Sequence, residues 1–334
     1  MWPGPDDPDF GAFLVPLTRQ LEALGHEVEV AAIDRRGGSR AKYARLTREA
    51  IARARRGRPD VIFAHMLFPA GASGALAAAA GQAPLVAMAH GQDVANLGQI
   101  AGVTGATRWV VRRAARVICN SRWLGDRLTE RIPMAGPKLE IANCGIDLDA
   151  FAPQPSSAAR AELDWEGDEP AFVCVGSLIE RKNVIRLADA FESLGRGRLA
   201  FVGDGPLGSA VEDRPNVRIT GRVPQSEVPR WIAAGDVLCQ PSLIEPFGQA
   251  TLEGMAMERS VVATTVGGPP EFVPPEAGVL VEPTDTSAMA AALERAARLP
   301  SPNPAAREAA AEHDVRRQAA TMAAVLERAI DERD

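Results

Sequence analysis

Two glutamates, Glu245 and Glu253, stand eight residues apart in the stretch PSLIEPFGQATLEGMA, residues 241–256. A helix rises about 1.5 Å per residue, so eight helical positions would hold the two carboxylates roughly 12 Å apart. That separation is too large for both groups to act on one bond, and we expect them to have different roles. Pro246 and Gly248 favour the turn before a helix over its interior. Glu245 is therefore expected on a loop and Glu253 within the helix that follows it.

The elements around these glutamates predict a site for an anion. The run VLCQ, residues 237–240, has the pattern of a buried strand, and a helix is expected over residues 249–257. The first turn of a helix presents unpaired backbone N–H groups, which bind anions. A diphosphate is expected against the backbone of residues 247–250, with Glu245 and Glu253 reaching hydroxyl groups on either side. The competing interpretation is a Glu245 that caps the helix and a Glu253 that is solvated.

Length and composition indicate a two-domain globular protein. The 334 residues are enough for two domains of about 150 residues each, and the content of 46% hydrophobic and 24% charged residues is ordinary. We find no uncharged apolar run of 18 residues, which a membrane-spanning helix would need. The start, MWPGPDD, lacks the basic and apolar segments of a signal peptide. The expected location is the cytoplasm.

The cysteines and histidines do not have the spacing of a metal site. The cysteines are widely separated, and most lie in or beside apolar runs, so reduced buried thiols are expected. They are Cys119, Cys144, Cys174 and Cys239, and the histidines are His26, His65, His90 and His313. We predict no structural metal.

Charge is unevenly shared between the two halves. Residues 1–150 carry 19 Lys plus Arg against 15 Asp plus Glu, a balance of +4, and residues 151–334 carry 18 against 28, a balance of −10. The basic excess lies in the stretch that runs from Arg35 to Arg58. It is interpreted either as a solvated helix with flexible ends or as a surface for anionic lipid headgroups or an acidic acceptor. Nucleic acid is not an expected partner, because the chain has a single tyrosine, Tyr43, and this basic run has no pattern of alternating basic and aromatic residues.

Short β-branched strands alternate with longer helical patterns in both halves, which predicts α/β domains with parallel, doubly wound sheets. The expected strands are 27–33, 61–65, 85–89, 117–120 and 139–142 in the first half, and 171–175, 199–202, 217–219, 237–240, 261–264 and 278–281 in the second. The expected helices are 11–24, 40–56, 71–80, 107–115 and 121–131, then 184–191, 227–234, 249–257 and 286–298.

The Pro- and Ser-rich stretch 151–170 is predicted to link the two domains. We expect a first domain over 1–152, a second over 153–313, and an amphipathic helix over 314–334 that packs back on the first. Two doubly wound domains are expected to face each other across a cleft at the carboxyl ends of their strands. The first domain lacks the strand that normally opens such a fold, or its first strand begins earlier than the pattern indicates.

Several motifs along the chain resemble those of the retaining nucleotide-sugar glycosyltransferases of family four, which have the GT-B fold. The resemblance rests on PSLIEPFGQATLEGMAMERSVVATTVGGPPEFV, residues 241–273, and on weaker motifs in the same order. These are GHEVEV (25–30), HGQDV (90–94), ARVICNS (115–121), KLEIANCGIDLDAFAP (138–153), VGSLIERKN (175–183), VGDGPL (202–207) and TGRVP (220–224). Together they cover nearly the whole chain.

The resemblance implies roles for residues of the second half. Glu253 would bind the ribose of the donor nucleotide and Glu245 the hydroxyls of the transferred sugar, while Lys182 would neutralise the diphosphate and stabilise it as it leaves. The diphosphate would lie along the backbone of Phe247, Gly248, Gln249 and Leu252. Gly176 would approach the donor, and Val223 would contact the base through its backbone. Ser177 departs from the family pattern, which often has arginine there, and Arg181 is a candidate replacement.

In the first half, the resemblance places His90 at the transferred sugar near the reacting carbon. His65 and Asp93 are candidates for the acceptor pocket, and Gly11 for a backbone approach to the donor phosphate. For each histidine the competing interpretation is a structural role.

The implied reaction is transfer of a hexose from a nucleoside-diphosphate sugar to an acceptor hydroxyl with retention, without a metal and without a cofactor besides the donor. A retaining hydrolase would need two carboxylates about 5 Å apart, which this spacing does not offer. The acceptor is expected to be a sugar, a lipid-linked molecule or another small molecule, as in polysaccharide or glycolipid biosynthesis, with peripheral membrane contact through residues 35–58. The alternatives are a catalytically silent relative that acts as a binding partner and a nucleotide-sugar epimerase.

Overall fold

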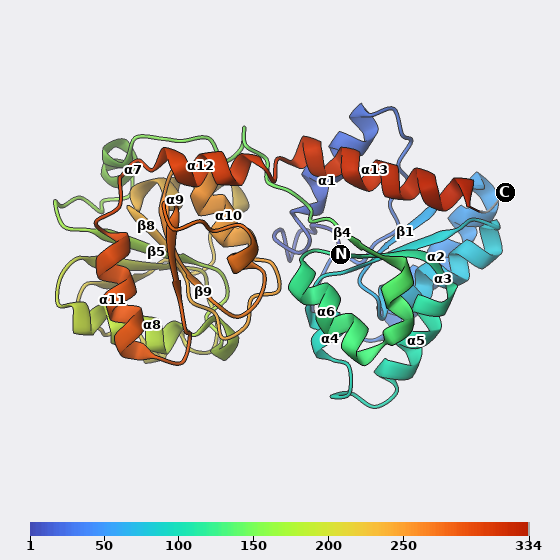
Figure 1. The fold of residues 1–334 in the computed structure, drawn as a ribbon, viewed down its shortest axis with the longest axis horizontal. Coiled ribbons are helices and arrows are strands. Elements are labelled where there is room, and N and C mark those ends of the chain that lie inside the picture. The colour runs from blue at the N-terminus through green and yellow to red at the C-terminus, as the bar shows by residue number, and fades with distance from the viewer. Residues whose placement is uncertain (333–334) are drawn as a thin grey trace. The chain divides into compact units, whose positions relative to one another are not determined.

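The computed structural model describes residues 1–332, so the last two residues of the predicted C-terminal helix lie outside the described part. The chain divides into two compact units. The first comprises Met1–Gly145 together with the C-terminal segment that begins at Val315, and the second is Ile146–Asp314. Each unit is a parallel sheet with helices on both faces, which confirms the predicted α/β fold class (Figure 1).

The first unit is built on a sheet of four parallel strands in the order β1-β2-β3-β4. The strands are β1 (Ile62–His65), β2 (Leu85–Ala89), β3 (Ala114–Cys119) and β4 (Leu139–Ile141). Every residue of β2 is buried, as expected for a strand with neighbours on both sides and helices on both faces. Because all four strands run the same way, their carboxyl ends share one edge of the sheet.

Helices cover both faces of this sheet. On one face, α1 (Leu14–Ala23) and α13 (Val315–Asp331) pack against Val86, Met88 and Ile118. On the other face, α3 (Ala70–Gly81), α5 (Val103–Arg113) and α6 (Arg122–Arg131) pack against the alternate strand residues, such as Ala87 and Val117. The helix α2 (Ala41–Gly57) lies against α3, and the short α4 (Gln92–Ala95) follows β2.

The strand predicted over residues 27–33 does not form, and in the described chain no strand precedes Ile62. An extended segment becomes a strand only when a neighbouring strand pairs with its N–H and C=O groups. The structure pairs β1 with β2 alone, and the segment 27–33 receives instead a single backbone bond, from Trp2 N to Ile33 O at 3.0 Å. The strand predicted from its alternating pattern is therefore wrong.

The second unit has six parallel strands in the order β7-β6-β5-β8-β9-β10. The strands are β5 (Ala171–Val175), β6 (Arg198–Val202), β7 (Val217–Ile219), β8 (Val237–Gln240), β9 (Ser260–Thr264) and β10 (Gly278–Val281). Counted from β5, the spatial order is 3-2-1-4-5-6, the order of a doubly wound nucleotide-binding sheet. From β5 the chain adds strands first on one side (β6, β7) and then on the other (β8, β9, β10), so the switch point lies between β5 and β8. Such folds bind ligands at this point.

Alternate residues of these strands point to opposite faces, and each face has its own helices. The helices α8 (Val184–Leu194) and α11 (Thr286–Ala296) cover the face of Phe172 and Phe201. The other face, with Val173 and Leu238, is covered by α7 (Ser156–Glu162), α9 (Val228–Ala234), α10 (Gln249–Ala256) and α12 (Pro304–Ala311). Both faces are visible in Figure 1.

The predicted domain boundary after residue 152 is too late, and the predicted linker 151–170 is wrong. The second unit begins at Ile146, whose N–H donates to His313 O at 2.8 Å. Within the expected linker, α7 forms, and Phe151 and Trp165 are buried in the core of the second unit. Buried aromatic side chains contribute strongly to a core, and they outweigh the loop-like composition of the surrounding residues.

Candidate functional site

The loops that follow β5 and β8 form the candidate site of the second unit. Gly176 follows β5 with a φ of +132°, a conformation that L side chains rarely adopt, and the loop ends in a short 3₁₀ turn, Glu180–Lys182. The loop after β8 carries Glu245. The two loops are joined by the backbone bond from Leu243 N to Arg181 O at 2.9 Å. Residues expected from the sequence to act on one ligand are thus brought together at the switch point.

Glu245 is buried and ion-paired. Its Oε2 lies 2.7 Å from Lys182 Nζ and 3.7 Å from Arg181 Nη1, and it accepts a hydrogen bond from Ser242 Oγ at 3.1 Å. Burial tends to raise the pKa of this carboxyl, but the charges of Lys182 and Arg181 and the two hydrogen bonds outweigh burial and lower its pKa. Glu245 is therefore ionised at neutral pH. It also holds the Lys182 ammonium at a fixed position.

The N-terminus of α10 lies directly after Glu245 in sequence. Gly248 precedes the helix with a φ of +108°, and a methyl group at its Cα would lie 3.3 Å from both Phe272 and Pro269. Leu252 N donates to Gly248 O at 3.0 Å, so the N–H groups of Ala250 and Thr251 lack an acceptor within the helix. This end of the helix carries partial positive charge and can bind an anion.

Glu253 has a different environment from Glu245. Its side chain is 8% exposed, and within the described residues no hydrogen bond is made to its carboxylate. Burial raises the pKa of Glu253 to about 8, although the nearby charge of Lys182 acts in the opposite direction. A protonated glutamate can both donate and accept hydrogen bonds. It could therefore hold a pair of hydroxyl groups without a neighbouring cation.

Val223 lies in the loop after β7. Its side chain packs against the core of the second unit, and its loop is joined to the site by a bridge between Gly203 and Gly221. A methyl group at Gly203 would lie 2.1 Å from Gly176 O, so only glycine allows this close backbone approach. The structure thus places the Val223 loop beside the Gly176 loop.

In the first unit, His65 ends β1 and His90 follows β2. Their side chains are in contact, with His65 Nδ1 3.1 Å from His90 Nε2 and ring centroids 5.3 Å apart. Burial lowers the pKa of His65 well below its usual value, and lowers that of His90 to about 3. Both imidazoles are neutral at pH 7, so one donates and the other accepts in this hydrogen bond.

The prediction that Asp93 contacts an acceptor is wrong. Its side chain is 0% exposed, and its oxygens accept hydrogen bonds from the backbone N–H of Leu67 (2.8 Å), His90 (3.1 Å), Gly91 (3.0 Å) and Val94 (3.2 Å). Burial raises the pKa of Asp93, and these bonds oppose that effect. Asp93 therefore ties together the loops that carry His65 and His90.

Gly11 lies in the turns before α1, which begins at Leu14 and not at residue 11 as predicted. It has a φ of +80°, and a methyl group there would lie 2.8 Å from Met1 Cβ. Gly11 is therefore required by the local backbone.

Two residues of the second-unit site were missed in the sequence. Ser242 donates to Glu245, and Asn183, which directly follows Lys182, is buried in a left-handed conformation with a φ of +60°. Their signal was present, because serine favours local hydrogen bonds and asparagine tolerates positive φ better than most residues. These preferences are shared by serine and asparagine in many ordinary turns, so they did not mark Ser242 and Asn183 as site residues.

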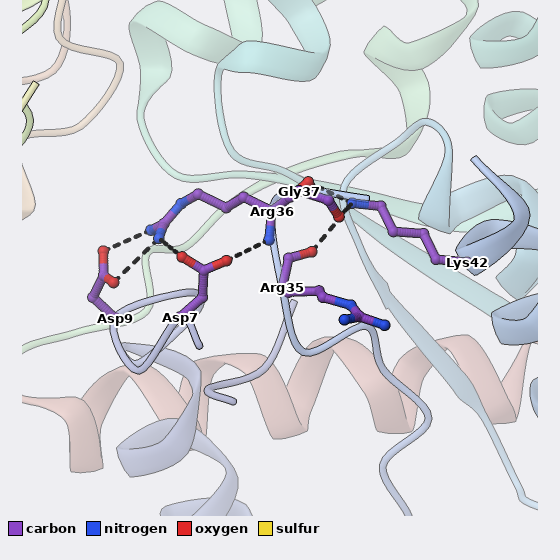
Figure 2. Close-up of polar contacts among 6 residues, drawn as sticks. All are labelled: Asp7, Asp9, Arg35, Arg36, Gly37 and Lys42. Atoms are coloured by element: carbon purple, nitrogen blue, oxygen red, sulfur yellow. Dashed lines mark hydrogen bonds and ion pairs between the residues drawn. The ribbon is translucent and has the colours of Figure 1, made fainter. Parts of the chain in front are cut away.

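The charge of the basic stretch 35–58 is partly neutralised by acidic side chains of its own unit, and its first residues make hydrogen bonds and ion pairs. Arg36 pairs with Asp7 at 3.1 Å and with Asp9 at 2.7 Å, and Lys42 Nζ donates to the carbonyl oxygens of Arg35, Arg36 and Gly37 (Figure 2). Further along, Arg53 pairs with acidic side chains of the first unit. Several side chains of this stretch make no ion pair in the described structure: Arg35, Arg40, Arg45, Arg48, Arg55 and Arg58.

Among residues 1–332, no three or more His, Cys, Asp and Glu side chains lie close enough together to hold a metal ion. None of the helices within the same residues has the length and apolar character that a membrane span requires. The four cysteines are buried free thiols, as predicted.

Comparison with known proteins identifies both halves of the chain. Residues 11–150 match the family model described as Glycosyltransferase Family 4, and residues 169–298 match that of Glycosyl transferases group 1. TuaC of Bacillus subtilis, a glycosyltransferase named for teichuronic acid biosynthesis, is 30% identical over 71% of this chain and 61% of its own length. A GDP-mannose-dependent phosphatidylinositol monomannoside mannosyltransferase of Mycolicibacterium smegmatis is 32% identical over 66% of this chain and 62% of its own.

The chain thus spans less than two thirds of the length of these relatives, whereas its match to solved structures is nearly complete. Sucrose-phosphate synthase from Thermosynechococcus elongatus aligns with a TM-score of 0.76 at 22% identity, over 95% of this chain and 92% of that protein. The Anabaena protein HepE, solved with UDP-glucose, aligns with a TM-score of 0.74 at 22% identity, over 93% and 88%. The family models and the fold agree, and the chain belongs to glycosyltransferase family 4, with the two α/β units of the GT-B fold.

Proposed function

We propose that the protein is a retaining hexosyltransferase that uses a nucleoside-diphosphate sugar as donor. The observation that carries the proposal is the second-unit site, where Lys182, Glu245, the N-terminus of α10 and the unpartnered Glu253 meet at the switch point of the sheet. Support also comes from the relatives, one of which is named GDP-mannose-dependent, and from a structural neighbour solved with UDP-glucose.

The donor is proposed to lie across the two loops. Its diphosphate would accept from the N–H groups at the start of α10 and from Lys182, and its ribose hydroxyls would bind the Glu253 carboxyl. Lys182 pairs with Glu245 at 2.7 Å, so a bound diphosphate would share the ammonium with that carboxylate. Glu245 would then have one oxygen available for hydroxyls of the hexose.

In the proposed reaction, the acceptor oxygen bonds to the anomeric carbon as the bond from that carbon to the diphosphate oxygen breaks. The acceptor proton passes to the departing diphosphate, whose charge Lys182 and the helix N-terminus stabilise. A double displacement would need a free carboxylate nucleophile, but Glu245 is ion-paired and burial raises the pKa of Glu253 to about 8. Because neither glutamate is a free nucleophile, we favour attack by the acceptor oxygen on the same face of the sugar from which the diphosphate leaves, which retains the configuration at the anomeric carbon.

The reaction is proposed to need neither a metal ion nor a cofactor besides the donor. The positive charge that a metal ion would supply to the diphosphate is available from Lys182 and from the N–H groups of α10. Full turnover in excess EDTA is the expected result. Recovery of lost turnover by Mg²⁺ or Mn²⁺ would refute metal independence.

The acceptor is proposed to be a sugar, a lipid-linked molecule or another small molecule that binds the first unit near His65 and His90. The unpaired arginines of the stretch 35–58 are proposed to make peripheral contact with an anionic membrane. Sedimentation with vesicles of phosphatidylglycerol, but not of phosphatidylcholine, would support this contact. The binding should weaken with salt and with the change Arg48→Glu, and equal binding to both vesicles would refute it.

The donor site is tested by thermal shift of the purified chain with UDP, GDP, ADP and their hexose conjugates. Ligand at about 100 times its Kd stabilises the folded state by about 2.7 kcal/mol. One base is expected to raise the Tm, and the rise should be lost in Glu253→Ala. A chain that melts cooperatively and responds to none of these ligands would refute the proposal.

A further inference from the structure

Asn183 connects three loops of the second-unit site. Its side-chain amide donates from Nδ2 to Pro241 O at 3.0 Å and to Pro283 O at 2.7 Å, and its Oδ1 accepts from Arg186 Nη1 at 2.7 Å. The residue is 5% exposed. Pro241 follows β8, and Pro283 lies in the loop after β10. The amide thus uses both of its N–H groups and its oxygen inside the protein.

These bonds restrain the backbone directly after Lys182, the residue that precedes Asn183. Lys182 closes the 3₁₀ turn, and Asn183 ends it in a left-handed conformation with a φ of +60° and begins α8. Pro241 is followed by Ser242, which bonds to Glu245, the partner of Lys182. The amide therefore joins the loop that carries Lys182 to the loop that carries Glu245, through a contact separate from the ion pair.

The backbone alone leaves the position of Lys182 less well defined. The lysine stem has four rotatable carbons, and an ammonium binds as a point charge without a fixed orientation. The ion pair between Lys182 and Glu245 would also weaken when a bound diphosphate shares the Lys182 ammonium. The amide contacts of Asn183 do not involve the ligand, so they persist when the ion pair is rearranged.

We propose that Asn183 is a positioning residue, which holds Lys182 at the terminal phosphate of the donor through its amide bonds to the loops after β8 and β10. This inference rests on the proposed function, because it assigns a diphosphate to Lys182. It makes a specific claim about selectivity: the loss of the amide should weaken binding of a nucleoside diphosphate more than binding of the matching monophosphate.

The test compares Asn183→Gly with the wild type. Glycine keeps the left-handed backbone and removes only the amide. The Kd values of UDP and UMP, GDP and GMP, and ADP and AMP are measured by calorimetry. The ratio of the monophosphate Kd to the diphosphate Kd is expected to fall roughly tenfold, the size of one charge-assisted hydrogen bond. The monophosphate Kd should stay within about twofold of the wild type.

Two further variants separate positioning from a general loss of structure. Asn216→Gly is the matched control, because Asn216 also has a positive φ, of +57°, and directly precedes β7 in the same unit, whereas Lys182 lies in the loop at the carboxyl end of β5. It should leave the ratio unchanged. In Lys182→Met the ratio should fall at least as far as in Asn183→Gly, and the double variant should show no further fall. Equal weakening of both nucleotides in Asn183→Gly would overturn the inference.

A second measurement needs no nucleotide, and so it separates this inference from the proposed function. The chain has three lysines, Lys42, Lys138 and Lys182, so reductive ¹³C-methylation gives a simple NMR spectrum. The Lys182 signal is expected to move toward the position of an exposed lysine in Asn183→Gly and to stay in place in Asn216→Gly. An unmoved signal would overturn the positioning role. A wild type that binds none of the nucleotides would refute the proposed function instead, and the NMR result would still decide the role of Asn183.

Discussion

Replacement of Glu253 by glutamine should change how the stability of the protein depends on pH. Burial raises the pKa of this carboxyl from the usual 4.5 to about 8 in the folded chain. Between these values the folded chain binds one proton more than the unfolded chain, so the free energy of unfolding falls as pH rises. Each tenfold change in proton affinity is worth 1.36 kcal/mol, which sets an upper limit of about 5 kcal/mol across the window.

Between about pH 5.5 and pH 8.5 the wild type should lose roughly 2 kcal/mol of this stability, after allowance for relaxation and water penetration around the carboxylate. Glutamine has nearly the same shape and does not titrate. The Tm of Glu253→Gln relative to the wild type should therefore rise by about 4–8 °C between these pH values, for a unit of this size.

The assay is thermal unfolding of both chains at several pH values, followed by circular dichroism. Glu166→Gln removes an exposed carboxylate from the same unit and controls for the loss of charge. A difference between Glu253→Gln and the wild type that does not change with pH would show that the carboxyl is not desolvated. In that case the ribose-binding role proposed for it would lose its physical basis.

Other substitutions test single contacts, each by urea unfolding. Lys182→Met should destabilise the second unit by about 3 kcal/mol, because it removes the nearer of the two cations beside the buried Glu245 and leaves only Arg181 at 3.7 Å. The added change Glu245→Gln should recover most of this loss without restoring nucleotide binding, and no recovery would mean that the pair is not coupled. Gly248→Ala should lower the free energy of unfolding by about 1–2 kcal/mol, because its φ of +108° strains any side chain. The affinity for the nucleotide should fall as well, and an unchanged affinity would mean that the N-terminus of α10 does not bind the ligand. Asp93→Ala should cost the first unit about 2–4 kcal/mol, since it leaves four backbone N–H groups without an acceptor, and a loss below about 1 kcal/mol would contradict that role. Burial lowers the pKa of His90 to about 3, so the wild type should lose stability as pH falls from the usual 6.5 toward that value, and His90→Gln should lose less over the same range; parallel curves would refute this.

The second unit was predicted more accurately than the first. The bounds predicted for β5, β7, β8 and β10 agree with the structure to the residue. Most of these strands are short apolar runs with turn and loop residues on both sides, so their pattern permits few other assignments. The structure gives Glu245 and Glu253 different environments, while the separate roles expected from their spacing stay a prediction.

The errors arose where long-range contacts decide the structure. The stretch 151–170 has the composition of a linker, but Trp165 packs against Trp231 with ring centroids 6.0 Å apart and anchors it in a core. Asp93 looked like a ligand-binding carboxylate because it follows a strand, and only the fold shows the four N–H groups that surround it. A single sequence carries no signal for such partners, because they lie on segments distant in the chain.

The placement of α13 in the first unit affects how the protein is made. Its apolar side chains, including Ala319 and Met322, complete the core over Leu14, Leu17 and Leu21 of α1. The ribosome synthesises this helix only after the whole of Ile146–Asp314, which at 5–20 residues per second is a delay of roughly 10–30 s. During that time the second unit can fold, while α1 exposes its leucines. Nascent chains should therefore recruit chaperones at the first unit until α13 has been synthesised.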